Sequence, residues 1–159
     1  MKNPVTKMFV VVRHGEDEQT NSLTPRGCED VLKLADAIEK KIKGIGGKVA
    51  LLTSPTRRAV ETAEIISKRL DIEEYQQCGP LFWDDKDHGE EQIEAILEMA
   101  GDYDVIIAVA HYNAPMGIVR AFSRRFCKEE FWCRKVPKSC GVSISRSGAV
   151  DYLPRPRDL

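Results

Sequence analysis

A cation and an imidazole stand side by side at the end of the first apolar run of the chain, where Arg13 and His14 are followed by Gly15. The run 8–12, Met-Phe-Val-Val-Val, predicts a buried β-strand. In open α/β sheets, ligands bind beyond the carboxyl ends of the strands. A glycine at that point lets the backbone turn or pass close to a ligand. A guanidinium beside an imidazole in such a place points to an anion, and a phosphate fits best.

Two further predicted strands end in residues of the same kind. The run 49–53 is followed, within the next predicted helix, by Arg57 and Arg58, and the run 104–110 is followed directly by His111. Helices are predicted to begin near these strand ends, and the N–H groups and dipole of a helix N-terminus favour anions. The pattern therefore places several cationic groups around one anion.

The chain has three histidines, and two of them, His14 and His111, occupy equivalent positions at strand ends. Because the carboxyl ends of parallel strands lie at one edge of a sheet, we expect the two imidazoles to face each other across a single tetrahedral anion. Each ring should then lie within about 6 Å, or two hydrogen-bond lengths, of that anion.

Strand and helix patterns alternate along the chain, which predicts a three-layer α/β/α sandwich with a mostly parallel central sheet. The predicted strands are 7–13, 49–53, 72–78, 104–110, 140–145 and 149–153, and the predicted helices are 25–43, 55–70, 89–100 and 113–126. The last two strands form a hairpin, which gives the sheet an antiparallel edge.

The first two helices carry start signals of the same type. Thr24 and Ser54 each precede a proline, which is typical of an N-cap followed by proline at the first helical position. The periodicity of the first helix predicts an inner face made of Val31, Leu32, Leu34, Ala35, Ile38 and Ile42.

Size and composition indicate one domain, 1–159, with a sizeable core. The formal net charge is −1, so no global attraction draws the chain to nucleic acid or to an anionic membrane. We expect no membrane span and no signal peptide, hence a cytoplasmic protein. The five cysteines contain no Cys-x-x-Cys pair, and neither a disulfide scaffold nor a metal site is predicted. Composition leaves the oligomeric state open.

Taken together, the motifs resemble the histidine phosphatase superfamily, which has the phosphoglycerate mutase-like fold, over most of the chain. The resemblance rests on Arg13-His14-Gly15, Leu23-Thr24-Pro25-x-Gly27, Ser54-Pro55-x-x-Arg58-Ala59-x-x-Thr62-Ala63 and Ala110-His111, in that order. The short length is most similar to the small bacterial branch that includes phosphohistidine phosphatases acting on signalling proteins.

The resemblance implies a role for each matching residue. His14 would attack phosphorus and become phosphorylated, while Arg13, Arg58 and His111 would hold the three phosphoryl oxygens. His111 would act as a protonated donor, a state that a phosphate dianion nearby favours. With so many fixed cations, no cofactor or metal is expected. Thr62 and Ala63 are interpreted as close helix-to-sheet packing.

The proton donor is the point at which the chain departs from the family pattern. Ester-cleaving members carry an acid, usually glutamate, in the loop after the third strand, and Trp83 stands at that place here. The nearest carboxylates are Asp84 and Asp85, of which we favour Asp84, and a third alternative is that no acid acts. A departing imidazole needs protonation far less than a departing alkoxide, so a displaced acid favours a phosphohistidine substrate.

Plainer interpretations exist for the same residues. Arg13 could pair with Glu16 or Asp17 on the surface, and either histidine of the pair could be a hydrogen-bonded core residue. Arg57 competes with Arg58 for one role, and His88 is interpreted as a surface residue.

The leading function is a metal-independent phosphatase acting on a phosphorylated small molecule or a phosphohistidine protein. The alternatives are a non-catalytic phosphate-binding or interaction module and, less favoured, a phosphomutase.

Overall fold

The computed structural model describes residues 4–19, 22–83 and 86–154. Within these residues, six strands form one sheet in the order β3-β2-β4-β1-β5-β6. The strands are β1 (Met8–Arg13), β2 (Val49–Thr53), β3 (Gln76–Gln77), β4 (Val105–Ala110), β5 (Gly141–Ser145) and β6 (Val150–Leu153). The helices are α1 (Pro25–Ile42), α2 (Arg57–Leu70), α3 (Gly89–Ala100) and α4 (Ala114–Phe126), with 3₁₀ turns at Gly79–Phe82 and Lys86–His88.

The sheet is parallel at its centre and antiparallel at one side. β4 pairs in parallel with β1 and with β2, and β2 pairs in parallel with β3. β5 runs antiparallel to β1 and to β6. The fold predicted from the sequence, a three-layer sandwich with a mostly parallel sheet and an antiparallel edge, is therefore confirmed.

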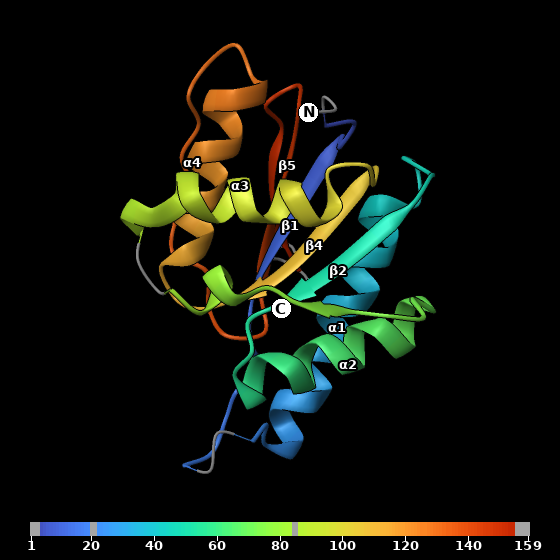
Figure 1. The fold of residues 1–159 in the computed structure, drawn as a ribbon. Coiled ribbons are helices and arrows are strands. Elements are labelled where there is room, and N and C mark those ends of the chain that lie inside the picture. The colour runs from blue at the N-terminus through green and yellow to red at the C-terminus, as the bar shows by residue number, and fades with distance from the viewer. Residues whose placement is uncertain (1–3, 20–21, 84–85, 155–159) are drawn as a thin grey trace.

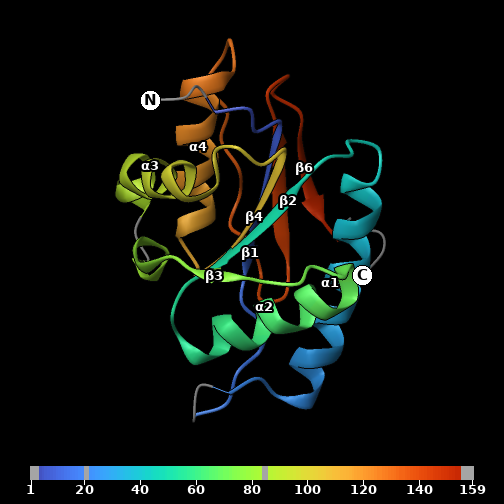
Figure 2. The same cartoon turned by 45° about the vertical axis from the view of Figure 1, so that its right-hand side comes forward.

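Each face of the sheet is covered by a pair of helices, with α1 and α2 on one side and α3 and α4 on the other (Figures 1 and 2). Alternate residues of β1 serve the two cores: Val10 and Val12 pack under α1 and α2, whereas Phe9 and Val11 pack under α3 and α4. All six residues of β4 are buried, as expected for a central strand covered on both faces.

Two predicted elements, α2 and β3, have boundaries that differ from the structure by more than one residue. Helix α2 begins at Arg57 with Thr56 as its N-cap, not at Pro55. The reason lies in Ser54, whose N–H donates to the carbonyl of Val109 and so prolongs the pairing of β2 with β4. β3 is only two residues long, because the chain turns back through a left-handed Asp71 at the end of α2 and reaches the sheet late.

One predicted core residue of α1 is also wrong, since Leu32 is 45% exposed. The buried stripe of that helix consists of Gly27, Val31, Leu34, Ala35 and Ile38. Leu32 follows Val31 by one residue and is therefore rotated about 100° away from the stripe on a helix of 3.6 residues per turn.

Candidate active site

Sheet register brings the predicted site residues to one edge. β4 lies between β1 and β2, and the N–H of His14 donates to the carbonyl of Ala110 at 3.2 Å. On the other side of β4, the N–H of Ser54 donates to the carbonyl of Val109 at 2.9 Å. His111 follows at the end of β4 itself. Three segments that are far apart in the sequence thus end side by side.

The imidazole of His14 is fixed at both nitrogens. Its Nδ1 lies 2.9 Å from the carbonyl oxygen of Gly15, and its Nε2 accepts a hydrogen bond from Nε of Arg58 at 3.1 Å. A carbonyl oxygen can only accept, so Nδ1 carries the proton and Nε2 presents its lone pair. The ring is therefore held in the neutral tautomer whose Nε2 can act as a nucleophile.

Burial favours this neutral form. His14 is 5% exposed, and removal from water lowers the pKa of His14 to about 4, with the charge of Arg58 contributing in the same direction. The Gly15 carbonyl opposes the shift because it accepts from the protonated ring as well. At neutral pH Nε2 therefore carries a lone pair rather than a proton.

His111 faces His14 across a short gap. The two ring centroids are 5.4 Å apart in an edge-on arrangement, and both side chains are buried. Nε2 of His111 lies 2.9 Å from the hydroxyl of Ser54. Ser54 is a site residue that the sequence does not reveal, since its position before a proline predicts a helix N-cap.

Arg13 is the last residue of β1, and its guanidinium contacts segments that follow β4 in the chain. Its Nη1 donates to the carbonyl of Val136 at 3.3 Å, and its Cζ lies 4.6 Å from the ring centroid of Tyr112. Asp17, considered as a surface partner for Arg13, instead pairs with Lys138 at 2.9 Å. The contact with Tyr112 could not be predicted, because an aromatic residue after a strand carries no specific signal.

The two adjacent arginines of α2 have different contacts. Arg58 reaches His14, whereas the side chain of Arg57 is 64% exposed and lies 3.8 Å from Glu61 one helical turn along. Of the two arginines, it is Arg58, the one that the motif spacing favours, that contacts His14.

Thr62 connects the turn after His14 to α2. Its Oγ1 accepts from the N–H of Gly15 at 3.0 Å and donates to the carbonyl of Arg58 at 2.8 Å. The sequence interpretation gives Thr62 a packing role only, and the structure adds this polar contact. Gly15 itself has no room for a side chain, since a Cβ there would lie 2.8 Å from Val31 Cγ2.

The segment that follows His14 is hydrogen-bonded to α2 and leads into the N-cap of α1. Glu61 of α2 accepts from the N–H of Leu23 at 2.9 Å and from the hydroxyl of Ser22. Thr24 caps α1 as predicted, accepting from the N–H of Gly27 at 2.9 Å. A Cβ at Gly27 would lie 2.4 Å from the carbonyl oxygen of Glu16, so the glycine of this motif is required by close packing.

The loop expected to supply an acid is described only in part, and Asp84 and Asp85 lie outside the described residues. Gln92 of α3 holds the preceding turn by donating to the carbonyls of Pro80 and Trp83, each at 2.9 Å. Phe82 is 56% exposed, and its ring centroid lies 6.1 Å from that of His111. His88 is exposed, as predicted, and lies against Trp83.

Residues 4–19, 22–83 and 86–154 contain neither a metal-binding cluster nor a membrane span. In this part of the chain, no group of three or more His, Cys, Asp or Glu side chains is arranged to hold a metal ion. None of its helices combines the length and the apolar character needed to cross a membrane.

A family model supports the interpretation of this geometry. The model of the histidine phosphatase superfamily (branch 1) matches residues 9–79, which contain Arg13, His14 and Arg58. The chain has the histidine phosphatase fold. The resemblance inferred from the motifs is thereby confirmed. Among curated proteins, no sequence matches the chain significantly.

Solved structures agree over nearly the whole chain. The protein histidine phosphatase SixA complexed with tungstate has a TM-score of 0.62 at 18% identity, covering 91% of this chain and 93% of that one. A putative phosphohistidine phosphatase SixA from Agrobacterium tumefaciens has a TM-score of 0.65 at 12% identity, covering 93% and 97%. A mycobacterial glucosyl-3-phosphoglycerate phosphatase in complex with VO3 has a TM-score of 0.66 at 13% identity, covering 92% and 97%.

Proposed function

We propose that this protein is a phosphatase that forms a covalent phosphohistidine on His14. The observation that carries the proposal is the fixed state of this imidazole, whose Nε2 lone pair faces Arg58 and lies close to the ring of His111. An imidazole that is neutral near pH 7 is a good nucleophile, and a covalent intermediate divides one difficult displacement into two easier ones.

The other site residues would stabilise the negative charge on the phosphoryl oxygens. In the proposed first step, Nε2 of His14 bonds to phosphorus while the bond to the leaving group breaks, and Arg13, Arg58 and His111 hold the three phosphoryl oxygens. Planar guanidiniums match these oxygens well. The Ser54 hydroxyl can accept from Nε2 of a protonated His111, which would keep the imidazolium oriented. Water then attacks phosphorus, and phosphate leaves with the N–P bond broken.

The substrate is either a phosphomonoester or a protein phosphohistidine. Asp84 stays our choice for the proton donor, with Asp85 or no acid as the alternatives. The similar solved structures include a protein histidine phosphatase and a glucosyl-3-phosphoglycerate phosphatase, one for each kind of substrate. A phosphohistidine depends least on a proton donor, because its leaving imidazole has a pKa near 7. This matters here because Trp83 stands where ester-cleaving relatives carry their acid.

The proposal is tested with 4-nitrophenyl phosphate, whose good leaving group makes the assay independent of an acid. We expect a burst followed by turnover, and a phosphoenzyme that is stable to alkali and labile to acid, as phosphohistidine is. His14→Ala should abolish both signals with the circular dichroism spectrum unchanged.

His88→Ala provides the matched control, because this third histidine is exposed, and it should retain the wild-type rate. A His14→Ala protein with full activity would refute the assignment of the nucleophile. Binding of phosphate without any turnover by the wild-type protein would instead support the non-catalytic module.

A further inference from the structure

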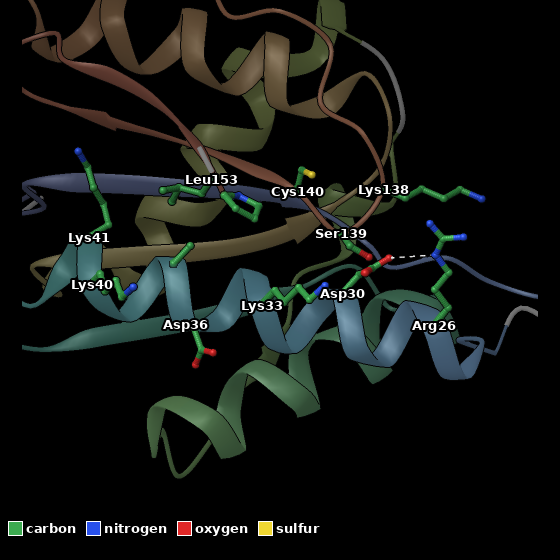
Figure 3. A pocket seen from close by; sticks show the side chains of 12 residues that line it. Arg26, Asp30, Lys33, Asp36, Lys40, Lys41, Lys138, Ser139, Cys140 and Leu153 are labelled. Atoms are coloured by element: carbon green, nitrogen blue, oxygen red, sulfur yellow. Dashed lines mark ion pairs between the residues drawn. The ribbon is translucent and has the colours of Figure 1, made fainter. Parts of the chain in front are cut away.

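A hollow lies next to the candidate site, between α1 and the segments that lead into β5 and out of β6. Its volume is about 1070 Å³. One wall is the length of α1, and the opposite wall is formed by residues 138–140 and by Leu153 and Pro154 (Figure 3). We call this hollow the α1 groove. None of the residues proposed for phosphoryl transfer lines it.

More cationic than acidic side chains line the α1 groove. Five cationic side chains line it against two carboxylates, and the cations are Arg26, Lys33, Lys40, Lys41 and Lys138. Three of these are already paired, with Asp30, Asp151 and Asp17 as their partners. Lys33 and Lys40 are exposed and form no ion pair with any residue of the described ranges. The groove therefore offers uncompensated positive charge on a protein whose net charge is −1.

One end of the α1 groove adjoins the nucleophile. The N–H of Ser139, in the groove wall, donates to the carbonyl of His14 itself at 3.1 Å. Its neighbour Lys138 lies 2.9 Å from Asp17, three residues after His14. This end of the groove is therefore in backbone contact with the segment that carries His14.

We propose that the α1 groove docks an acidic segment of a phosphorylated protein substrate. The inference rests on the proposed phosphatase function and specifies the substrate as a protein. Charge complementarity identifies the occupant, since aspartate and glutamate side chains are the anions that a protein segment offers to Lys33 and Lys40.

The lining of the groove favours an acidic protein segment over a nucleic acid. Grooves that bind single-stranded nucleic acid combine cations with aromatic side chains on which bases stack. The described residues that line the α1 groove include no aromatic side chain.

The length of the groove sets the length of the segment. Arg26 and Lys41 are fifteen residues apart on α1, which corresponds to about 22 Å at 1.5 Å per residue. An extended chain advances about 3.3 Å per residue, so about seven residues fill the groove. The docking segment should therefore be a short acidic run close to the phosphorylated residue.

The test compares two phosphotyrosine peptides that differ only in a flanking run of seven Glu or seven Gln residues, placed on either side of the phosphotyrosine. At low salt the wild-type protein should hydrolyse the Glu peptide with a kcat/KM about tenfold higher, and the preference should fade towards 0.5 M salt as the charges are screened. Lys33→Glu and Lys40→Glu should each reduce the preference several-fold, and the double variant should abolish it.

Lys128→Glu is the control for a single charge reversal, because Lys128 is exposed and follows α4 on the other face of the sheet. It should leave the preference intact, and none of the variants should alter turnover of 4-nitrophenyl phosphate. Equal rates on the two peptides, or an equal loss in Lys128→Glu, would overturn the proposal. Stronger competition by a single-stranded oligonucleotide than by the unphosphorylated Glu peptide would assign the groove to nucleic acid instead.

Binding separates this inference from the proposed function. A fluorescein-labelled, unphosphorylated Glu peptide should bind the wild-type protein more tightly than the Lys33→Glu/Lys40→Glu variant, as measured by fluorescence anisotropy. This result would support docking even if 4-nitrophenyl phosphate were not turned over. Normal turnover of that ester without peptide binding would leave the phosphatase standing and refute the docking site.

Discussion

Two neighbouring arginines in the first turn of α2 have different surroundings. The guanidinium of Arg58 is directed at the buried imidazole of His14, in a place where water is scarce and electrostatic interactions are strong. The guanidinium of Arg57 lies mostly in solvent beside Glu61, where an ion pair contributes little. Only the first of these charges can act strongly on a phosphoryl group bound next to His14.

This difference predicts unequal effects on catalysis. Arg58→Ala should lower kcat/KM for 4-nitrophenyl phosphate about 10²- to 10³-fold, the usual cost of removing one donor that stabilises a developing charge. Arg57→Ala should change kcat/KM less than about threefold, in keeping with a median value of about 0–1 kcal/mol for an exposed ion pair. Steady-state kinetics on the two purified variants provide the measurement, and a larger loss in Arg57→Ala would reverse the assignment.

At this scale the charged groups of the site were easier to predict than their partners. The proximity of His14, Arg58 and His111 could be predicted because cations and imidazoles that gather at the carboxyl ends of strands are typical of an anion site. The contact between Ser54 and His111 could not, since a serine before a proline is equally typical of a helix N-cap. Whether a hydroxyl turns to its own backbone or to another strand is decided by tertiary packing, which local patterns do not report.

Helices α3 and α4 pack so closely at Gly89 that no side chain fits between their backbones. A Cβ on Gly89, at the start of α3, would lie 2.1 Å from the carbonyl oxygen of Gly117 in α4. Backbone cannot yield to such a contact as a flexible side chain could. The two helices can pack this closely only because this position has no side chain, and α3 in turn holds the turn that contains Phe82 through Gln92.

Gly89→Ala is therefore expected to destabilise the fold despite the better helix propensity of alanine. Overpacking of this kind costs about 1–3 kcal/mol, which should appear as a lower urea midpoint at an unchanged m-value. Gly79→Ala serves as the control, because a Cβ there meets nothing within 4 Å. Equal midpoints for Gly89→Ala and the wild-type protein would show that the helices can separate without cost.

Periodicity located every helix and every strand of the described chain, but it located boundaries less well. The predicted start of α2 is two residues early, because Pro55 suits the first turn of a helix as well as the extended stretch that it occupies. The predicted β3 is too long. The residue types at 72–78 do not indicate at which residue the chain, after the preceding turn, reaches the sheet. Both errors arise where long-range pairing overrides local preference.

For the molecule as a whole, the burial of His14 links the candidate site to the stability of the fold. The pKa of His14 is lowered to about 4 in the native state, against an ordinary value near 6.5. Between these two pH values the unfolded chain binds a proton at this residue and the native protein does not. Stability therefore falls as the pH is lowered through this window, and above about pH 6.5 the effect is absent.

The predicted size of this effect is at most about 3 kcal/mol, at about 1.4 kcal/mol per pKa unit. Urea unfolding of the wild-type protein and of His14→Ala is measured at several pH values between about 4 and 7.5. The difference between the two proteins isolates the contribution of His14 from that of other titrating groups. The free energy of unfolding of the wild-type protein should decline relative to that of the variant as the pH falls. A difference that stays constant with pH would mean that His14 titrates normally.

The order of the strands has a further consequence. β4 stands between β1 and β2 in the sheet but follows both along the chain, so His14 and Arg58 cannot be placed correctly until residues 105–110 have inserted between their strands. Such non-local parallel pairing is slow, because loop closure must precede the contacts that compensate for it. A nascent chain that ends before β4 would therefore contain His14 and Arg58 without the strand that brings their segments together.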